Sequence, residues 1–173
     1  MAPAVVLVGA PGAGKTVVGS AVAARLGLGF RDTDRDTEEV AGATITEIFV
    51  DQGESGFRKR EREAVRAALT DATGVVALGG GAVEDPHTLT QLREGAAAVV
   101  WLQVGANEAA KRAGISGPRP LLLGNVRTTW LGQLRRREPL YREVADYEVA
   151  TDDRSEDEVA AEIVAILTEE KHL

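Results

Sequence analysis

The chain has 173 residues, enough for one domain with its own hydrophobic core. Hydrophobic residues make up 44% and charged residues 27%, proportions typical of a globular protein. There is no cysteine, which excludes thiol catalysis, cysteine-bound metals and disulfides, and only two histidines, which disfavours a histidine-based metal site. The net charge of -7 disfavours a nucleic-acid-binding role, so an anionic ligand must be held by local positive charge.

Neither the N-terminus nor any internal stretch has the pattern of a membrane or export segment. Residues 1–8 are apolar but lack a basic flank and run directly into a glycine loop, which predicts a first strand. The longest apolar stretch, residues 96–104, is too short to span a bilayer. We therefore expect a cytoplasmic protein without membrane contact.

Short apolar runs of buried-strand type alternate with helical patterns along the chain. This alternation requires crossover connections, so we predict a single α/β domain over residues 1–173, with a mostly parallel sheet between helices. Ligands of such sheets bind beyond the carboxyl ends of the strands. Strands are predicted at residues 5–8, 75–78, 97–104 and 147–150, with one more ending near residue 32. Helices are predicted up to residue 26, at residues 34–41, from residue 44, and at residues 54–69, 86–94, 107–113, 128–137 and 156–170, with a mobile loop at residues 114–125.

Capping signals mark several of the predicted helix ends. Glycine is the common residue just after a helix, and a hydroxyl or carboxylate side chain is common just before one. The expected caps are Gly27 and Gly42 at helix ends, and Thr44 with Glu47, Asp85 with Pro86, and Ser155 with Glu158 at helix starts.

The segment after the first predicted strand is a P-loop. Residues 9–16, Gly-Ala-Pro-Gly-Ala-Gly-Lys-Thr, match the pattern G-x-x-x-x-G-K-[ST] between a strand and a helix. The glycines let backbone N–H groups turn toward phosphate oxygens. Lys15 reaches the outer phosphates and the Thr16 hydroxyl ligates magnesium. The sequence therefore predicts a phosphotransferase that binds ATP with Mg²⁺.

Two carboxylates, Asp32 and Asp34, follow the second predicted strand. With strand spacing i, i+2 both would point into the crevice, where one could hold magnesium through water and the other accept a proton from an attacking hydroxyl. Asp34 is equally well explained as a helix N-cap. The third strand does not end in the usual Walker-B aspartate, which favours Asp32 for the magnesium role.

Three arginines are candidates for holding anions. Arg58 shares a helix face with Glu61, which could steady it toward a ligand, although a surface ion pair is the simpler explanation without further context. Arg119, between two prolines, fits a lid arginine that swings onto the γ-phosphate, or an ordinary solvated arginine. Arg137 ends the basic helix, where a cation often only complements the helix dipole.

The third predicted strand ends in three consecutive glycines, residues 79–81. A plain turn needs only one or two, whereas three allow the backbone to approach a ligand closely. Together with the P-loop, Asp-Thr-Asp at 32–34, Phe-Arg-x-x-Glu at 57–61, Arg-Pro-Leu-Leu at 119–122 and Arg-x-Pro-Leu-Tyr at 137–141, this chain resembles the shikimate kinase family over essentially its whole length.

The resemblance implies transfer of the ATP γ-phosphate to the 3-hydroxyl of shikimate, a step toward chorismate and the aromatic amino acids. It implies the nucleoside-monophosphate-kinase-like fold, with a five-stranded parallel sheet, a substrate-binding region at residues 32–61 and a mobile lid at residues 112–125. Asp34, Lys15 and Arg119 are the implied catalytic residues, with Asp34 as base. The implied ATP-binding residues are Gly12, Ala13, Gly14, Lys15, Thr16, Val17, Arg112, Arg119 and Arg154; those for shikimate are Asp34, Arg58, Gly80, Gly81 and Arg137; those for Mg²⁺ are Thr16 and, through water, Asp32.

Two alternatives stay open on the sequence alone. Another small-molecule kinase of the same fold, for gluconate or a nucleoside monophosphate, would share the P-loop and sheet. A nucleotide-binding switch or scaffold would share the P-loop, but it has no need of Asp34, Arg58 and Arg137 together. We expect shikimate and ATP as the only partners, and a monomer.

Overall fold

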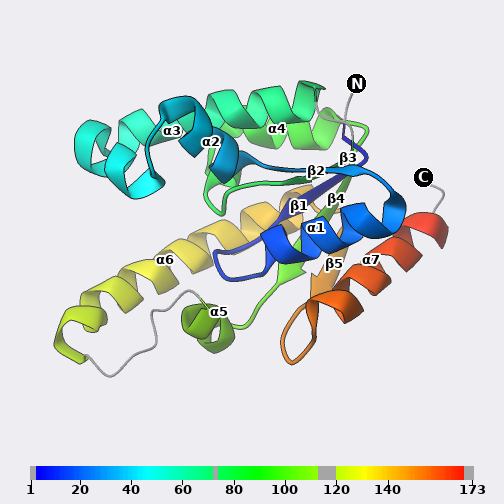
Figure 1. Ribbon diagram of the computed structural model, residues 1–173. Helices are drawn as coiled ribbons and strands as arrows, with labels where there is room; N and C mark the ends of the chain where they lie inside the picture. Colours follow the sequence, from blue (N-terminus) through cyan, green and yellow to red (C-terminus); the bar gives the residue numbers. More distant parts are fainter. Residues whose placement is uncertain (1–2, 72–73, 113–119, 170–173) are drawn as a thin grey trace.

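A five-stranded parallel sheet with strand order β2-β3-β1-β4-β5 forms the centre of the protein (Figure 1). The structure is a computed structural model that describes residues 3–71, 74–112 and 120–169, without the side chains of residues 120–127. The sheet confirms the predicted α/β class and parallel topology. The strands are β1 (Val5–Val8), β2 (Gly29–Asp32), β3 (Gly74–Ala77), β4 (Ala98–Gln103) and β5 (Tyr147–Ala150).

The central strand β1 is buried on both faces. It pairs with β3 on one side, where Val5 is opposite Val75, and with β4 on the other. Every residue of β1 has 0% exposure. Because alternate side chains of a strand point to opposite faces, Val5 and Leu7 enter one core while Val6 and Val8 enter the other. Burial on both faces explains why the strand is continuously apolar.

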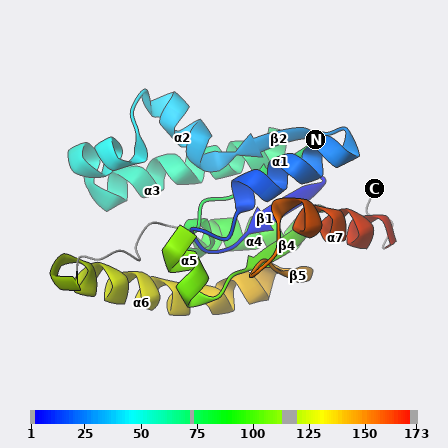
Figure 2. The same ribbon diagram turned by 60° about the horizontal axis from the view of Figure 1, so that its bottom comes forward.

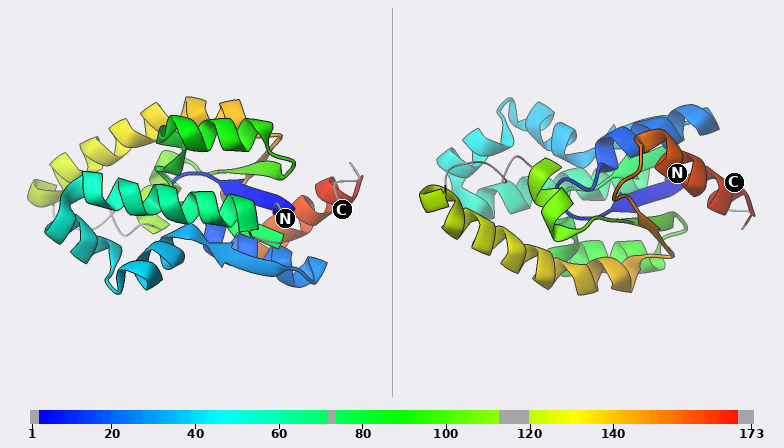
Figure 3. Two further views of the ribbon diagram at one scale, coloured as in Figure 1. Left: turned by 90° about the horizontal axis from the view of Figure 1, so that it is seen from above. Right: turned by 90° about the horizontal axis from the view of Figure 1, so that it is seen from below.

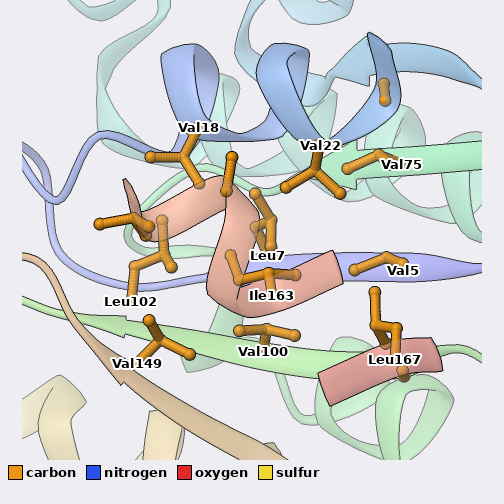
Figure 4. Close-up of a cluster of buried hydrophobic side chains, with 14 of the residues drawn as sticks. Val5, Leu7, Val18, Val22, Val75, Val100, Leu102, Val149, Ile163 and Leu167 are labelled. Carbon is orange, nitrogen blue, oxygen red and sulfur yellow. The ribbon is translucent and has the colours of Figure 1, made fainter. Parts of the chain in front are cut away.

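Helices cover both faces of the sheet (Figure 3). On one face, α1 (Lys15–Leu26) packs beside α7 (Glu156–Glu169). Figure 4 shows Val22 of α1 and Ile163 of α7 in the core between these helices and the strands. On the other face, Val65, Leu92 and Tyr141 are buried against the sheet. These three residues come from α3 (Ile45–Asp71), α4 (Pro86–Glu94) and α6 (Pro120–Val144).

One end of the sheet is surrounded by helical segments: the starts of α3 and α6 and three short elements. The start of α3 and the start of α6 both extend beyond the end of the sheet where the loop after β1 lies (Figure 1 and Figure 2). Parallel strands bring their carboxyl ends to one edge, so the P-loop after β1, Asp32 at the end of β2 and the glycines after β3 meet there. The other short elements are α2 (Thr33–Ala41), the 3₁₀ turn η1 (Ala82–Glu84) and α5 (Ala106–Arg112).

The predicted capping signals are confirmed. Asp85 accepts a hydrogen bond from the Thr88 backbone N–H at 2.9 Å, with Pro86 as the first residue of α4. Gly53, at φ 69°, separates α3 into two helical segments, as the two predicted helices required. The pairs Thr44 with Glu47 and Ser155 with Glu158 form reciprocal capping boxes, and Gly27 and Gly42 end α1 and α2.

The bounds predicted for α6 are wrong at both ends. The helix begins at Pro120, inside the predicted loop over residues 114–125, and it continues past Arg137 and through Pro139 to Val144. Proline is tolerated at a helix start, whereas inside a helix it costs about 3 kcal/mol. Burial of Tyr141 and Val144 in the core beyond Pro139 offsets that cost. The turn η1 was not predicted. Within the part of the chain that is described, no helix combines the length and apolarity needed to cross a membrane.

Candidate active site

The P-loop leads from β1 into α1, whose first residue is Lys15. The Lys15 ammonium donates hydrogen bonds to the carbonyl oxygens of Gly9 at 2.7 Å and Ala10 at 2.9 Å. Gly12 has φ 84°, and a Cβ there would lie 2.8 Å from the Ala109 carbonyl oxygen, so only glycine fits. Burial lowers the pKa of Lys15 to about 8, against the opposing effect of the nearby carboxylates of α2 and β2. The loop therefore holds a partly desolvated cation beside the phosphate-binding backbone.

Thr16 and Asp32 form an oxygen pair next to the P-loop. The Thr16 hydroxyl donates to Asp32 Oδ2 at 2.6 Å. Magnesium in kinases keeps several waters and binds one or two protein oxygens together with substrate phosphates. The oxygens of Thr16 and Asp32 are ligands of the kind that Mg²⁺ prefers. Among the described residues, no three acidic or histidine side chains are grouped to hold a metal ion.

Asp34 lies in the first turn of α2 and not on an extended strand. The strand spacing predicted for Asp32 and Asp34 is wrong because α2 begins at Thr33. The N-cap of α2 is Asp32, whose Oδ1 accepts from the Asp34 backbone N–H at 2.9 Å, so the alternative role of Asp34 as N-cap is also wrong. Both carboxylates nevertheless line one cavity of about 270 Å³ with the P-loop. Burial, and then the charges of Asp32 and Glu61, raise the pKa of Asp34 to about 6.

Arg58 is fixed by a buried carboxylate. Its Nη1 donates to Glu61 Oε1 at 2.6 Å, and Glu61 is only 4% exposed. The guanidinium also lies 5.2 Å from the centroid of the Phe57 ring, which packs against Phe49. The pair is therefore no exposed surface ion pair, which was the simpler explanation on the sequence alone. Burial raises the pKa of Glu61, while Arg58 opposes that rise.

The glycine turn after β3 allows these side chains to converge. A Cβ on Gly79 would lie 2.6 Å from Asp34 Oδ1 and 2.9 Å from Glu61 Oε2. A Cβ on Gly81 would lie 2.5 Å from Arg58 Nη1. No side chain can be added at either position without displacing these groups. The turn thus brings the backbone into contact with Asp34, Glu61 and Arg58.

Arg137 is nearly buried, at 5% exposure, and belongs to this cluster. Its Nε donates to Glu84 Oε2 at 3.0 Å. One helical turn further, the Tyr141 hydroxyl donates to the Gly80 carbonyl oxygen at 2.6 Å. An exposed dipole-complementing cation does not have these contacts. The sequence analysis gave no role to Glu84 or Tyr141. Tyr141 stood in a recognised motif, which was a signal for it. Nothing in the sequence pairs Glu84 with an arginine more than fifty positions away.

Arg112 and Arg154 lie beside the P-loop near the end of β5, away from the cluster of Arg58 and Arg137. Arg112 donates to the Thr151 carbonyl oxygen at 3.1 Å and to the Gly12 carbonyl oxygen at 3.4 Å. Arg154 donates to the Ala150 carbonyl oxygen at 2.9 Å. A cavity of about 200 Å³ between them adjoins the start of α1, and Val17 and Ala13 contribute to its lining. The assignment of these residues to an adenine subsite stays a prediction.

The structure brings together all the described candidate residues at the carboxyl edge of the sheet. Arg119 lies outside the described residues, as do residues 113–118 of the predicted lid. A P-loop on a five-stranded parallel sheet, with Asp32 and Asp34 at the end of β2 and arginines from α3 and α6 nearby, defines a P-loop kinase.

Comparison with known proteins identifies the family. The family model "Shikimate kinase" matches residues 11–168. A shikimate kinase of Salinispora arenicola is 50% identical over 167 residues, covering 96% of this chain and 99% of that protein. The structure of a shikimate kinase from Acinetobacter baumannii in complex with shikimate superposes with a TM-score of 0.89 at 35% identity, covering 99% of this chain and 95% of the other. The chain belongs to the shikimate kinase family.

A gluconokinase from Sinorhizobium meliloti shares the fold alone. It superposes with a TM-score of 0.60 at 21% identity, covering 96% of this chain and 92% of the other. The gluconate kinase considered as a rival from the sequence is therefore related to this chain in fold, while the sequence of this chain places it with the shikimate kinases.

Proposed function

We propose that the protein transfers the γ-phosphate of ATP to the 3-hydroxyl of shikimate, giving shikimate 3-phosphate and ADP on the route to chorismate. The observation that carries this proposal is the convergence of two arginines from separate helices on the acceptor side of the P-loop. Arg58 Nη2 lies 3.9 Å and Arg137 Nε 3.0 Å from the same oxygen of Glu84. Two converging guanidiniums suit a carboxylate, because each can form paired charge-assisted hydrogen bonds.

Asp34 is the proposed base of the reaction. The proton of the 3-hydroxyl passes to an Asp34 carboxylate oxygen as the hydroxyl oxygen bonds to the γ-phosphorus, and the bond from that phosphorus to the oxygen bridging to the β-phosphate breaks to release ADP. A pKa of about 6 keeps this carboxylate ionised at neutral pH yet basic enough to accept a proton. Gly80 and Gly81 would contribute backbone contacts to shikimate from the turn that touches Asp34 and Arg58.

The remaining roles concern ATP. The backbone of Gly12, Ala13 and Gly14 and the Lys15 ammonium would hold the phosphates, with Val17, Arg112 and Arg154 around the adenine. Thr16, and Asp32 through water, would hold Mg²⁺, which supplies neutralisation of phosphate charge when bound. Arg119 stays a prediction as the lid arginine. We propose a location in the cytoplasm, where ATP is available, and a monomer, because a single chain supplies all the described residues of the proposed site.

The direct test is ADP release in the presence of ATP, Mg²⁺ and either shikimate, gluconate or AMP. We expect turnover with shikimate and none above background with the other two. The Lys15→Ala variant is the blank, since it should lose turnover while keeping the fold. Turnover with gluconate or AMP but not shikimate would contradict the proposal.

A further inference from the structure

Glu84 contacts three arginines next to the proposed acceptor site. Its Oε1 accepts a hydrogen bond from Arg136 Nε at 2.6 Å, and its Oε2 accepts one from Arg137 Nε at 3.0 Å. Arg58 Nη2 lies 3.9 Å from the same Oε2. Partial burial acts to raise the pKa of Glu84, but its hydrogen bonds to Arg136 and Arg137 and their charges hold that pKa below its usual range. The carboxylate is therefore the shared partner of both arginines proposed to bind the substrate carboxylate.

The backbone holds Glu84 firmly at this place. It ends the 3₁₀ turn η1, and its N–H donates to the Gly81 carbonyl oxygen at 3.1 Å. The next residue, Asp85, is the N-cap of α4, which fixes the direction of the chain after the turn. The same glycine turn accepts the Tyr141 hydroxyl at the Gly80 carbonyl oxygen. Three hydrogen bonds thus join α6 to the segment after β3: those of Arg136 and Arg137 to Glu84, and that of Tyr141 to the Gly80 carbonyl oxygen.

The way Glu84 holds Arg137 leaves part of the guanidinium for a ligand. A guanidinium has five N–H donors; Glu84 accepts from the one on Nε of Arg137, and the Tyr141 hydroxyl also interacts with this guanidinium. Glu61 holds Arg58 in a comparable way, through Nη1. We propose that Glu84 is a positioning residue for shikimate binding, which fixes Arg137 so that its remaining N–H groups face the substrate carboxylate. This inference rests on the proposed function.

The contacts of Glu84 with Arg58 and Arg137 also allow the opposite expectation, that Glu84 weakens shikimate binding. Because Glu84 lies within 4 Å of both arginines, it could compete with the substrate carboxylate and weaken its binding. The hydrogen bond from the buried Arg137 argues for positioning: an arginine that is 5% exposed has little freedom to change partners, so a fixed partner limits the ordering cost of binding. The two expectations differ in the sign of one measurable change.

The test compares the wild type with Glu84→Gln, which keeps the shape and removes the charge. We expect the KM for shikimate to rise by roughly 5- to 30-fold, the effect of taking one charge from a charge-assisted hydrogen bond, with the KM for ATP changed by less than about twofold. Glu84→Asp restores the charge on a shorter side chain, so its KM for shikimate should lie between those of the wild type and Glu84→Gln. Glu143→Gln removes a carboxylate that pairs with Arg93 away from the site and should match the wild type.

A double-mutant cycle shows whether Glu84 acts through Arg137. In an Arg137→Lys background, Glu84→Gln should add less than about threefold to the KM for shikimate, because the group that Glu84 positions is already lost. A fall in the KM for shikimate in Glu84→Gln would establish competition and overturn the inference. An unchanged KM, or independent effects in the cycle, would also overturn it. A wild type that does not phosphorylate shikimate would overturn the proposed function, and this inference with it.

Discussion

Thr16 and Asp32 join the first turn of α1 to the end of β2 through a hydrogen bond of 2.6 Å between the hydroxyl and Oδ2. Residues sixteen positions apart thus place two hard oxygen donors side by side at the phosphate-binding loop. This is the relationship on which the proposed Mg²⁺ site depends, since neither oxygen alone would hold the ion as well.

Replacing the Thr16 hydroxyl should weaken the use of magnesium. Thr16→Val keeps the size and branching of the side chain but removes the oxygen, so we expect the Mg²⁺ concentration for half-maximal activity to rise by roughly tenfold or more. Thr16→Ser is the matched control, because it keeps the oxygen, and it should stay close to the wild type. Equal magnesium dependence in the two variants would contradict the assignment.

The activity should depend on the ionisation of Asp34. Because the pKa of Asp34 is raised to about 6, kcat/KM for shikimate should rise with pH through that value and then level off. Asp34→Asn should lose that inflection and lower the rate by about 10²–10⁴-fold, the range for a lost general base. The measurement is the pH–rate profile of both proteins. A loss of less than about tenfold would mean that Asp34 only positions shikimate, because phosphoryl transfer demands little from a base.

Asp34 should also lower the free energy of unfolding as the pH rises. A carboxyl whose pKa is higher in the folded state than in the unfolded state binds more protons when folded. The stability it contributes is therefore present below about pH 4 and lost as the pH rises through about 6. Asp34→Asn removes this loss, so at pH 8 it should raise the free energy of unfolding by on the order of 1–3 kcal/mol, and by little at pH 4. Denaturant titrations at both pH values measure the difference; a variant less stable than the wild type at pH 8 would contradict it.

A single methyl group at Gly79 should disturb the site. A Cβ there would lie within 3 Å of carboxylate oxygens of both Asp34 and Glu61, so Gly79→Ala should reduce kcat/KM for shikimate by roughly tenfold or more. Gly132→Ala is the control: nothing lies within 4 Å of its added Cβ, and it is in α6. This control should keep full activity and gain up to about 1 kcal/mol of stability, since alanine favours a helix over glycine. Equal activity in the two variants would show that the glycine turn does not shape the site.

The sequence predicted the features that depend on local chemistry. The P-loop, the buried strands and the capping boxes each follow from residues close together in the chain, and the structure has them where the pattern placed them. The bounds of α6 could not be predicted in this way, because Pro139 is tolerated only through the burial of Tyr141 and Val144 in the core.

The candidate site was predictable to a smaller extent. Motifs identified Asp34, Arg58 and Arg137, but the geometry of Asp34 was wrong, because one residue decides whether β2 continues or α2 begins. Tyr141 stood in a recognised motif, but its contact with the Gly80 carbonyl oxygen was not predicted, and no pattern in the sequence indicated a role for Glu84. Contacts of this kind depend on how α6 packs against the glycine turn, which no local rule contains.

The proposed function depends on two arginines that bind a carboxylate of the acceptor. The most direct measurement is kcat/KM of the wild-type protein for shikimate and for its methyl ester, which keeps the ring and hydroxyls but removes the charge. A hydrogen bond to a charged group contributes about 1.5–3 kcal/mol, so we expect kcat/KM for the ester to be lower by roughly tenfold to a few hundredfold. If the ester is phosphorylated as efficiently as the acid, Arg58 and Arg137 do not bind the acceptor through its carboxylate, and the proposed acceptor site is wrong.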